Sequence, residues 1–297
     1  MPYTLDQWRQ LGRFFDYNRK SIFYVEAGQG FPLVVLHGFP TASWDWHHIW
    51  DNLSARYQAI APDFLEFGFS DKPRNYPYSM FDQADMVEQL LRERGIESYF
   101  LLTHDIGDTV AQELLARQID RKTNQIRAVC LLNGGLFPET HHALPIQKQL
   151  LGQWGWLISR LVNEKRFKQS LTKVFGKNTQ PSPADFDAYW QLMNRQQGQR
   201  NLHLLIRYIA ERRQHRERWV GALQNTSAPI RLIDGLDDSI SGAHMVRRYR
   251  ELILNPNVVE LPGIGHYPQT ETPSEVLRAV VEFFGGVGDY PTTNSSN

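Results

Sequence analysis

The chain has 297 residues, 41% of them hydrophobic and 22% charged, which is a composition typical of globular proteins. Its formal net charge is zero, and this disfavours the usually basic class of dedicated nucleic-acid-binding proteins. The only cysteine, Cys130, excludes an internal disulfide bond, and because the sequence has no signal-peptide core, no membrane-spanning run and no zinc-type spacing of Cys and His, we expect a cytoplasmic protein without a cofactor or a metal.

Short apolar runs alternate with helical patterns along most of the chain. The runs predict strands at residues 21–26, 33–36, 57–62, 99–103, 126–132, 230–233 and 258–261. Helices are predicted at residues 81–94, 109–119, 244–253 and 273–284. The run Leu33-Val34-Val35-Leu36 is continuously apolar, as in a strand that is buried on both faces. The alternation therefore favours the α/β class, with a parallel sheet that helices cover on both faces.

The alternation stops between about residues 136 and 223, where the pattern is helical. Residues 144–222 include fourteen Lys and Arg residues and five acidic residues, so this stretch carries +9 and the rest of the chain −9. A helical insertion within an α/β sheet predicts a lid over a site at the carboxyl ends of the strands. The predicted division is an α/β core of residues 1–135 and 222–285, a helical lid of residues 136–221 and a disordered tail of residues 286–297.

The charge and the aromatic residues of this segment suggest what the predicted lid contacts. Solvated helix faces are the simplest interpretation of the charge, and the alternatives are electrostatic steering and peripheral contact of the basic lid with a membrane. An apolar wall for a substrate pocket is suggested by Trp154, Trp156, Phe167, Phe175 and Trp190. The expected partners are a small apolar organic substrate and water, with no nucleic acid and no integral membrane segment.

A strand, a tight turn and a helix are predicted around Thr103-His104-Asp105-Ile106-Gly107. A nucleophile elbow needs small residues two positions before and after the nucleophile, because that residue has a strained backbone and its neighbours are crowded. Gly107 meets this need and Thr103 meets it in part, which makes Asp105 the candidate nucleophile. Asp108 is expected to stabilise the helix dipole, and the alternative is a second charge that raises one of the two pKa values.

The segment His37-Gly38-Phe39-Pro40 follows the predicted strand at residues 33–36. An α/β-hydrolase supplies one amide of its oxyanion hole from this position, and the residue after the nucleophile supplies the other. The candidates for the two amides are therefore Phe39 and Ile106.

An acid and a histidine follow two later predicted strands. Asp238 is the preferred acid after residues 230–233, because it completes a Gly-x-x-Asp turn, and Asp237 is the alternative. His266 lies in a glycine-rich loop after residues 258–261. The chain order nucleophile, acid, histidine is the one that the α/β-hydrolase fold uses.

From about Phe15 to Phe284 the sequence resembles the epoxide hydrolase and haloalkane dehalogenase branch of the α/β-hydrolases. The post-strand segment Gly68-Phe69-Ser70-Asp71-Lys72-Pro73 is similar to a motif of that branch. Within the branch, the chain resembles the mesoderm-specific transcript protein group through the segments at residues 104–114, 133–141 and 218–223. The resemblance implies a mostly parallel eight-stranded sheet with helices on both faces and an inserted helical lid, and it leaves the substrate open.

An aspartate nucleophile restricts the chemistry. Asp is ionised at neutral pH without a base, since its ordinary pKa is about 4. It suits displacement at an sp³ carbon, which leaves an alkyl ester on the enzyme. His266, oriented by Asp238, would then activate water to hydrolyse that ester, and the oxyanion hole would serve this second step. Attack on a carboxylic ester would give a mixed anhydride, so an ordinary esterase is disfavoured.

Two leaving groups fit such a nucleophile. An epoxide needs an acid, which similar enzymes supply with two lid tyrosines; Tyr208 is placed like the second of them, and Tyr189 is a weaker substitute for the first. A halide needs side-chain N–H donors, and the positions that similar dehalogenases use hold Ile106 and Phe39, which have none. The sequence therefore favours an epoxide hydrolase-like enzyme. The alternatives are a haloalkane dehalogenase-like hydrolase and a non-catalytic interaction protein on the same fold.

Overall fold

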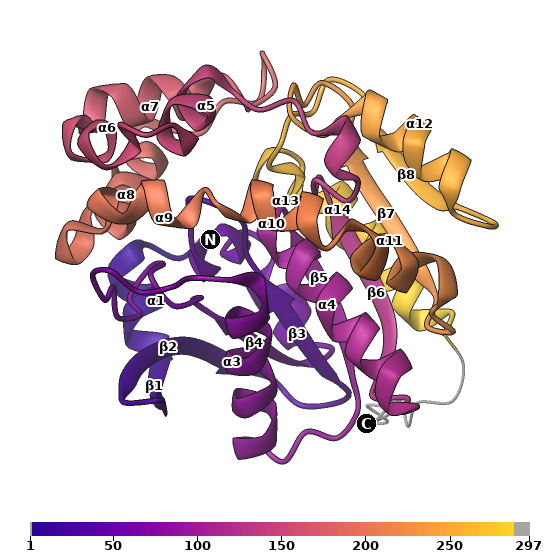
Figure 1. Ribbon diagram of the computed structural model, residues 1–297. Helices are drawn as coiled ribbons and strands as arrows, with labels where there is room; N and C mark the ends of the chain where they lie inside the picture. Colours follow the sequence, from indigo (N-terminus) through magenta and orange to yellow (C-terminus); the bar gives the residue numbers. More distant parts are fainter. Residues whose placement is uncertain (1, 288–297) are drawn as a thin grey trace.

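The computed structural model describes residues 2–287, and in that part of the chain the strands form an eight-stranded sheet (Figure 1). In spatial order the strands are β1 (Gly12–Tyr17), β2 (Lys20–Ala27), β4 (Gln58–Pro62), β3 (Pro32–Leu36), β5 (Tyr99–His104), β6 (Ile126–Leu132), β7 (Ile230–Gly235) and β8 (Asn257–Leu261). The β1–β2 and β2–β4 pairs are antiparallel and the other neighbouring pairs are parallel, which confirms the expected mostly parallel sheet. The predicted disordered tail lies, from residue 288 onward, outside the described residues.

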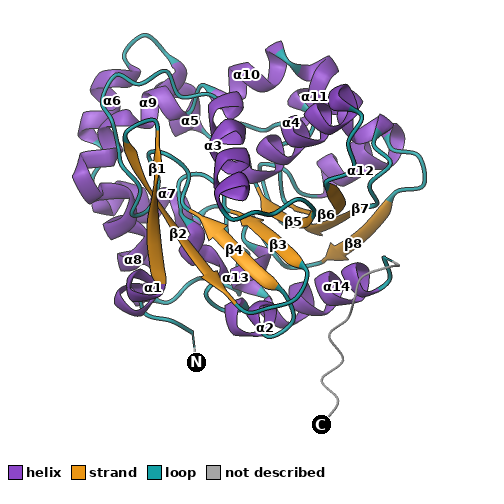
Figure 2. Cartoon of the chain, turned by 90° about the horizontal axis from the view of Figure 1, so that it is seen from below, coloured by secondary structure: helices purple, strands orange, loops and turns teal. Residues whose placement is uncertain are grey.

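The central strands are buried on both faces because helices cover the sheet from two sides. All six residues of β5 are buried, and the apolar run Tyr99-Phe100-Leu101-Leu102 with which it begins is typical of a strand covered on both faces. The helices α3 (Met80–Glu93), α4 (Ile106–Arg121) and α12 (Ala243–Leu252) lie on one face, and α2 (Trp50–Ser54) and α14 (Pro273–Gly285) lie on the other (Figure 2).

The N-terminal elements α1 (Leu5–Leu11) and β1 were not predicted. Helix α1 begins at Thr4, whose side chain accepts a hydrogen bond from the amide of Gln7 while the Gln7 side chain accepts one from the amide of Thr4. It buries Trp8 completely. Strand β1 is an edge strand that pairs only with β2 and is mostly exposed, so its sequence lacks the apolar run of a central strand.

Between β6 and β7 the described chain is helical, and we call the part from α5 to α11 the helical insertion. Its helices are α5 (Pro145–Leu151), α6 (Gly155–Leu161), α7 (Glu164–Thr172), α8 (Pro183–Asn194), α9 (Leu202–Leu205), α10 (Tyr208–Gln214) and α11 (Arg216–Asn225). The insertion lies across one end of the sheet (Figure 1). Its last helix, α11, packs along α4 of the core and contains the predicted boundary at residue 222.

The register brings the ends of four parallel strands to one edge of the sheet. Leu36 at the end of β3 pairs with Thr103 of β5, and Gly235 at the end of β7 pairs with Leu261 of β8. The loops after these strands therefore meet beneath the insertion. None of the helices within residues 2–287 is long and apolar enough to cross a membrane.

Candidate active site

A cavity of about 500 Å³ separates the helical insertion from the strand ends. Its floor includes residues that follow β3, β5, β7 and β8, namely Phe39, Asp105, Ile240 and His266. The insertion and Leu144, which directly precedes it, supply a largely apolar wall that includes Leu150, Ile158, Phe167, Met193 and Leu202. The space is suited to an apolar molecule.

Of the five aromatic residues expected to form this wall, only Phe167 lines the cavity. Trp190 packs beside Phe167 from outside, with ring centres 5.7 Å apart. Trp154 and Trp156 are exposed on the outer surface of the insertion. Phe175 also lies outside the lining and stacks on Tyr267, with ring centres 4.8 Å apart. The expectation was wrong for these four residues because aromatic composition indicates packing without indicating which side chains face the cavity.

Asp105 occupies the strained turn between β5 and α4. Its φ of 49° and ψ of −104° lie outside the regions that residues with a Cβ atom usually adopt. A Cβ atom at Gly107 would lie 2.7 Å from the carbonyl oxygen of Leu36, and one at Gly38 would lie 2.5 Å from Nδ1 of His104. Both glycines therefore allow the turn and the neighbouring loop to approach each other.

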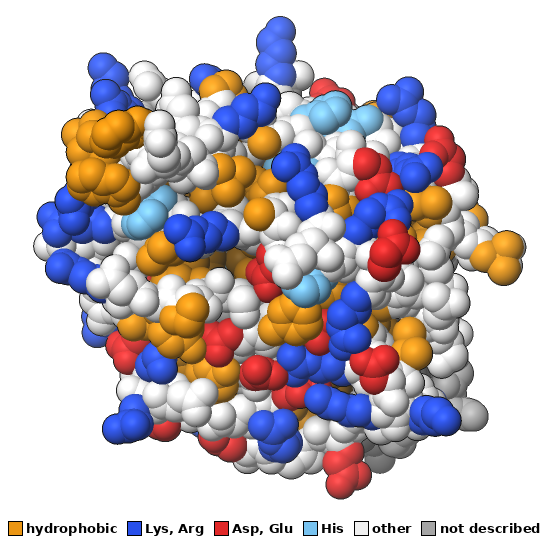
Figure 3. Space-filling model, in the orientation of Figure 1, with side chains coloured by type: hydrophobic (Ala, Val, Ile, Leu, Met, Phe, Trp, Pro, Cys, Tyr) orange, Lys and Arg blue, Asp and Glu red, His pale blue; other side chains and the backbone are white. Residues whose placement is uncertain are grey.

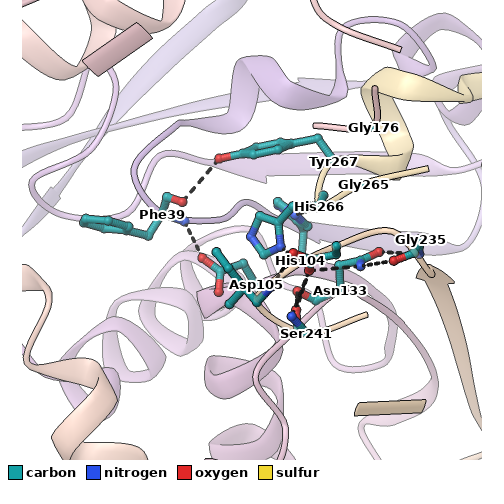
Figure 4. Close-up of polar contacts among 12 residues, drawn as sticks. Phe39, His104, Asp105, Asn133, Gly176, Gly235, Ser241, Gly265, His266 and Tyr267 are labelled. Carbon is teal, nitrogen blue, oxygen red and sulfur yellow. Dashed lines mark hydrogen bonds and ion pairs between the residues drawn. The ribbon is translucent and has the colours of Figure 1, made fainter. Parts of the chain in front are cut away.

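The carboxylate of Asp105 is buried at the cavity floor and held from two sides. The amide of Phe39 donates a hydrogen bond to Oδ2 over 3.0 Å (Figure 4). Nη2 of Arg212 donates to the backbone oxygen of Asp105 over 3.0 Å and lies 3.5 Å from Oδ1. The Ile106 amide is in the first turn of α4, where a helix leaves its N–H groups without internal partners. Both predicted oxyanion-hole residues thus flank Asp105.

Electrostatics keep the Asp105 carboxyl ionised. Burial by itself raises its pKa, but the positive charges of His266 and Arg212 lower it by more, and the net pKa lies below the ordinary value. The buried carboxylate is therefore ionised at neutral pH without a neighbouring base.

Arg212 was not singled out in the sequence. It lies in α10, is 2% exposed and donates from Nε to Thr109 Oγ1 over 2.7 Å. Its guanidinium carbon is 4.6 Å from the centre of the Tyr208 ring. The interpretation of the insertion's charges as solvated faces therefore fails for this residue. The available signal was spacing: Arg212 follows Tyr208 by four positions, one helical turn along the same face.

His266 and Asp238 form a buried pair. Nδ1 of His266 is 2.7 Å from Oδ2 of Asp238, whereas Asp237 is exposed and accepts a hydrogen bond from the Gly263 amide. Burial lowers the pKa of His266, but the charge and the hydrogen bond of Asp238 raise it, to about 9. Burial raises the pKa of Asp238, but the charge of His266 and the hydrogen bonds lower it, to about 2. The structure thus places Asp238, and not Asp237, beside the histidine.

Several donors orient the Asp238 carboxylate. Oδ2 accepts hydrogen bonds from the hydroxyl of Ser241 over 2.7 Å and from the side-chain amide of Asn133 over 3.2 Å, and Oδ1 accepts one from the Ile240 amide over 2.8 Å. The Asn133 side chain also exchanges two hydrogen bonds with the backbone of Gly235 (Figure 4). Asn133 follows β6, so it ties the acid to the centre of the sheet.

Two buried histidines hold loops of the site rather than react. His104 Nε2 donates to the carbonyl oxygen of His266 over 2.7 Å. His37 Nδ1 donates to the carbonyl oxygen of Gly38 over 2.8 Å, and its Nε2 accepts from the Phe64 amide. Burial is the main reason that the pKa of each ring is lowered to about 3, so both rings are neutral.

The two candidate tyrosines have different positions. Tyr208 is buried and lines the cavity, its ring packs against Phe39, and its hydroxyl has no hydrogen-bond partner among the described residues. Tyr189 is also buried but does not line the cavity, and its hydroxyl is 3.5 Å from Thr270 Oγ1. Tyr208 therefore lines the same cavity as Asp105 and His266, whereas Tyr189 lies outside that lining, next to Thr270.

Thr103 and Asp108, which lie on either side of the elbow, are hydrogen-bonded to each other. The Thr103 hydroxyl donates to Oδ1 of Asp108 over 2.5 Å, and both residues are completely buried. Burial is the largest cause of a strongly raised pKa of Asp108, and the charge of Asp105 adds to it. The alternative in which one of two neighbouring carboxyls has a raised pKa therefore applies. No group of three or more His, Cys, Asp and Glu side chains among residues 2–287 is arranged to hold a metal ion.

Comparison with known proteins identifies related sequences. Residues 32–273 match the model of the family described as alpha/beta hydrolase fold. The mesoderm-specific transcript protein of Mus musculus is 42% identical, over 94% of this chain and 88% of its own length.

Solved structures share the fold. Haloalkane dehalogenase DbeA from Bradyrhizobium elkani superimposes with a TM-score of 0.81 at 22% identity, over 93% of this chain and 98% of that chain. Epoxide hydrolase CorEH superimposes with a TM-score of 0.75 at 22% identity, over 93% of this chain and 99% of that chain. At these identities the likeness extends to the fold alone.

Proposed function

Because the chain belongs to the alpha/beta hydrolase fold family, we propose that it is a hydrolase in which Asp105 attacks an sp³ carbon and forms an alkyl ester with its substrate. Membership of the family supports hydrolase activity in general. The observation that carries the finer proposal is the ionised Asp105 carboxylate at a strained turn, with the Phe39 amide on one oxygen and Arg212 beside the other. Both neighbours orient the carboxylate toward one direction of attack.

In the first step, the substrate class that fits best is an epoxide. Oδ1 of Asp105 forms a bond to a ring carbon while the bond between that carbon and the epoxide oxygen breaks. The oxygen leaves with the electron pair and takes a proton from the hydroxyl of Tyr208, a residue that lines the cavity and whose hydroxyl has no other partner among the described residues. Burial and the charge of Asp105 raise the pKa of Tyr208, and the Arg212 guanidinium over its ring opposes this increase. Ester formation removes the charge of Asp105, so in the ester the remaining influence of Arg212 favours the tyrosinate.

In the second step, water hydrolyses the ester. His266 takes a proton from water, and the hydroxide adds to the carboxyl carbon of Asp105. The negative charge then develops on Oδ2, which the Phe39 amide contacts, and we assign the Ile106 amide in the first turn of α4 as the second donor to this charge. The tetrahedral intermediate collapses as the bond between the carboxyl carbon and Oδ1 breaks. The alkoxide that leaves with Oδ1 takes the proton of the new Asp105 carboxyl group and departs as the alcohol. The proton held by His266 then returns to the Tyr208 phenolate, which restores the starting state of the enzyme. Esterification removes the charge of Asp105, which contributes to the raised pKa of His266, so the ester itself favours the neutral histidine that this step needs.

The dehalogenase alternative has one observation in its favour, the fold shared with DbeA. Against it, no Trp or Asn side chain is among the described residues that line the cavity, so a departing halide would lack the indole and asparagine donors expected of similar dehalogenases. The amide side chains that do line the cavity belong to Gln147, Gln149 and Gln169 of the insertion wall. Halide release from a panel of haloalkanes tests this alternative directly.

The helical insertion would act as the lid. It supplies most of the cavity wall and places Tyr208 and Arg212 next to the nucleophile. A small apolar substrate then enters between the insertion and the core, and water follows. The competing interaction-protein hypothesis predicts that Asp105→Asn leaves the cellular function of the protein unchanged.

The experiment is turnover of epoxides in ¹⁸O-water, followed by mass spectrometry of the peptide that carries Asp105. We expect label in the Asp105 carboxylate after repeated turnovers, because hydroxide adds to that carbon. Asp105→Asn is the matched control for activity. Label in the product alone, with none in Asp105, would rule out the ester intermediate.

A further inference from the structure

An apolar surface patch covers the outer side of α5 and α6. Its members are Leu151, Trp154, Trp156, Leu157 and Leu161. Each of them is between 38% and 61% exposed, although five such residues within eleven positions would normally be buried. Figure 3 shows hydrophobic side chains gathered over this part of the molecule, which is where Figure 1 labels α5 and α6. We call these five residues the α6 patch.

Basic side chains surround the α6 patch. Between Leu144 and Lys173 the chain has six Lys and Arg residues and a single acidic residue, Glu164, which pairs with Lys168. The guanidinium carbon of Arg160 lies 5.0 Å from the centre of the Trp156 ring, so one basic group is in contact with the patch itself. The remainder of the chain is net negative, so this positive charge is local to the insertion.

The α6 patch is continuous with the cavity. Leu161 belongs to the patch, being 54% exposed, and it also lines the cavity together with Ile158 and Val162 of the same turn of chain. Arg166, which follows in α7, lines the cavity and is exposed. An apolar molecule that reached the patch would thus meet an apolar path to the cavity, with a cation at its side.

The charge pattern decides which occupant fits the α6 patch. A second copy of this chain docked by a twofold axis would bring the basic rim of one copy against the basic rim of the other, which is repulsive. An anionic lipid bilayer complements both parts. Indole and leucine side chains enter the boundary between headgroups and acyl chains, and Lys and Arg remain at the phosphate level.

We propose that the α6 patch docks on an anionic lipid bilayer, and that the substrate is an amphipathic lipid that passes from the bilayer into the cavity. The docking stands on the α6 patch and its basic rim alone. The substrate class rests on the proposed function, because it assigns the reacting group of that lipid to the site at Asp105.

The test of docking is co-sedimentation of the full chain with phosphatidylcholine vesicles, with and without phosphatidylglycerol. We expect binding to the vesicles that contain phosphatidylglycerol. The double change Trp154→Asp and Trp156→Asp should abolish it, while Leu254→Asp, a change at an exposed leucine after α12, should leave it intact. Arg160→Gln with Lys165→Gln should weaken it by about 25-fold, because each basic side chain near such a surface contributes about fivefold.

Melting curves of all variants establish that each is folded. Equal binding to both kinds of vesicle, or equal binding by the Trp154/Trp156 variant and the Leu254 variant, would overturn the docking proposal. Self-association of the protein that the same tryptophan changes abolish, without vesicle binding, would replace the bilayer by a second copy.

The chemistry is separable from the docking. Asp105→Asn protein should bind the vesicles as the unchanged protein does. The Trp154/Trp156 variant should turn over a water-soluble epoxide at the normal rate but lose most of its rate with an epoxidised fatty-acyl lipid held in vesicles. An equal loss with both substrates overturns the bilayer route, whereas absent turnover of any epoxide with intact vesicle binding overturns the proposed function alone.

Discussion

Nη2 of Arg212 lies 3.0 Å from the backbone oxygen of Asp105 and 3.5 Å from its Oδ1. The helical insertion thus reaches the turn that carries the candidate nucleophile through a buried cation. Nη1 of the same guanidinium is buried and has no partner among the described residues, so the group is held by Nη2 and by the bond from Nε to Thr109. The position of α10 and the charge state of Asp105 are therefore linked.

Replacing Arg212 should change the acidic side of the pH–rate profile. Arg212→Gln removes a positive charge that lowers the pKa of Asp105, so the rate of ester formation should begin to fall at a higher pH than in the unchanged protein. Stability should also fall, by about 3–5 kcal/mol if this buried pair behaves like others. Stopped-flow single turnovers across pH, with thermal melts, measure both effects. Arg213→Gln, at the exposed neighbouring position, should change neither.

Arg212→Lys separates charge from geometry. It keeps the positive charge but loses the planar fork that contacts both Asp105 and Thr109. In Arg212→Lys protein we expect the pH profile to return close to that of the unchanged protein, while the rate remains reduced. A lysine variant with the same displaced profile as Arg212→Gln would contradict an electrostatic role.

Replacing His266 should trap the ester. His266→Gln leaves Asp105 ionised and able to attack, but it removes the base that activates water in the second step. Incubation with an epoxide should therefore add the mass of the substrate to the peptide that contains Asp105, and turnover should stop after one equivalent. Mass spectrometry of intact protein and peptides provides the measurement, and Asp105→Asn/His266→Gln protein must stay unmodified.

The two tyrosines offer a matched pair of variants. Tyr208→Phe removes the hydroxyl of a residue that lines the cavity and should lower the rate of epoxide opening by about a hundredfold or more, as loss of a general acid does. Tyr189→Phe removes a hydroxyl that lies near Thr270 and should leave the rate near normal. Rapid-quench kinetics of the first step distinguish them. Equal losses in the two variants would assign Tyr208 a packing role.

The pair of His266 and Asp238 predicts a pH dependence of stability. The pKa of His266, about 9, is above its ordinary 6.5, so its stabilisation is fully present below pH 6.5 and is lost as pH rises through 9. The pKa of Asp238, about 2, is below its ordinary 3.8, so its stabilisation is present above pH 3.8 and is lost as pH falls through 2.

Asp238→Asn should therefore remove the part of this dependence that lies between pH 6.5 and 9. Urea denaturation at both pH values should show a smaller difference in unfolding free energy for the variant than for the unchanged protein. Lys72 titrates in the same window, with a pKa lowered to about 8 chiefly by burial, so the comparison between the two proteins is what counts. NMR titration of the His266 ring should show a lower pKa in the variant than in the unchanged protein. An unchanged ring pKa would contradict the assignment of Asp238 as the group that raises it.

Much of the core could be predicted because strands that are buried on both faces appear in the sequence as short apolar runs. Each of the seven predicted strands is present, and the parallel register brings the loops of Asp105, Asp238 and His266 to one edge. The roles of these residues remain predictions. Strand β1 was not predicted because an exposed edge strand does not require a run of apolar residues.

The contacts of the insertion could not be predicted in the same way. Whether an arginine in a basic segment is solvated or buried depends on which helix face meets the core, and fourteen such residues look alike in composition. Arg212 is buried and Arg213 is exposed, although they are neighbours. Trp154 and Trp156 show the converse, because they are apolar yet lie outside.

Gly135, in the loop after β6, provides the most local test of the contact between the insertion and Asp105. A Cβ atom at this position would lie 2.4 Å from Nη1 of Arg212, so Gly135→Ala should displace the guanidinium and reproduce the pH shift of Arg212→Gln. Gly221→Ala is the control. Its Cβ atom would meet nothing closer than 3.9 Å, and as a helical position in α11 it should gain about 0.5–1 kcal/mol of stability.

A double variant shows whether the clash at residue 135 is with Arg212. Glutamine is shorter than arginine, so in Arg212→Gln protein the added methyl group has room, and Gly135→Ala should cost much less stability there than in the unchanged protein. The two changes share one contact and should therefore be strongly non-additive in melting and in the pH profile. Additive effects would mean that the methyl group clashes with another residue. The absence of a side chain at Gly135 would then not be what makes room for the Arg212 guanidinium.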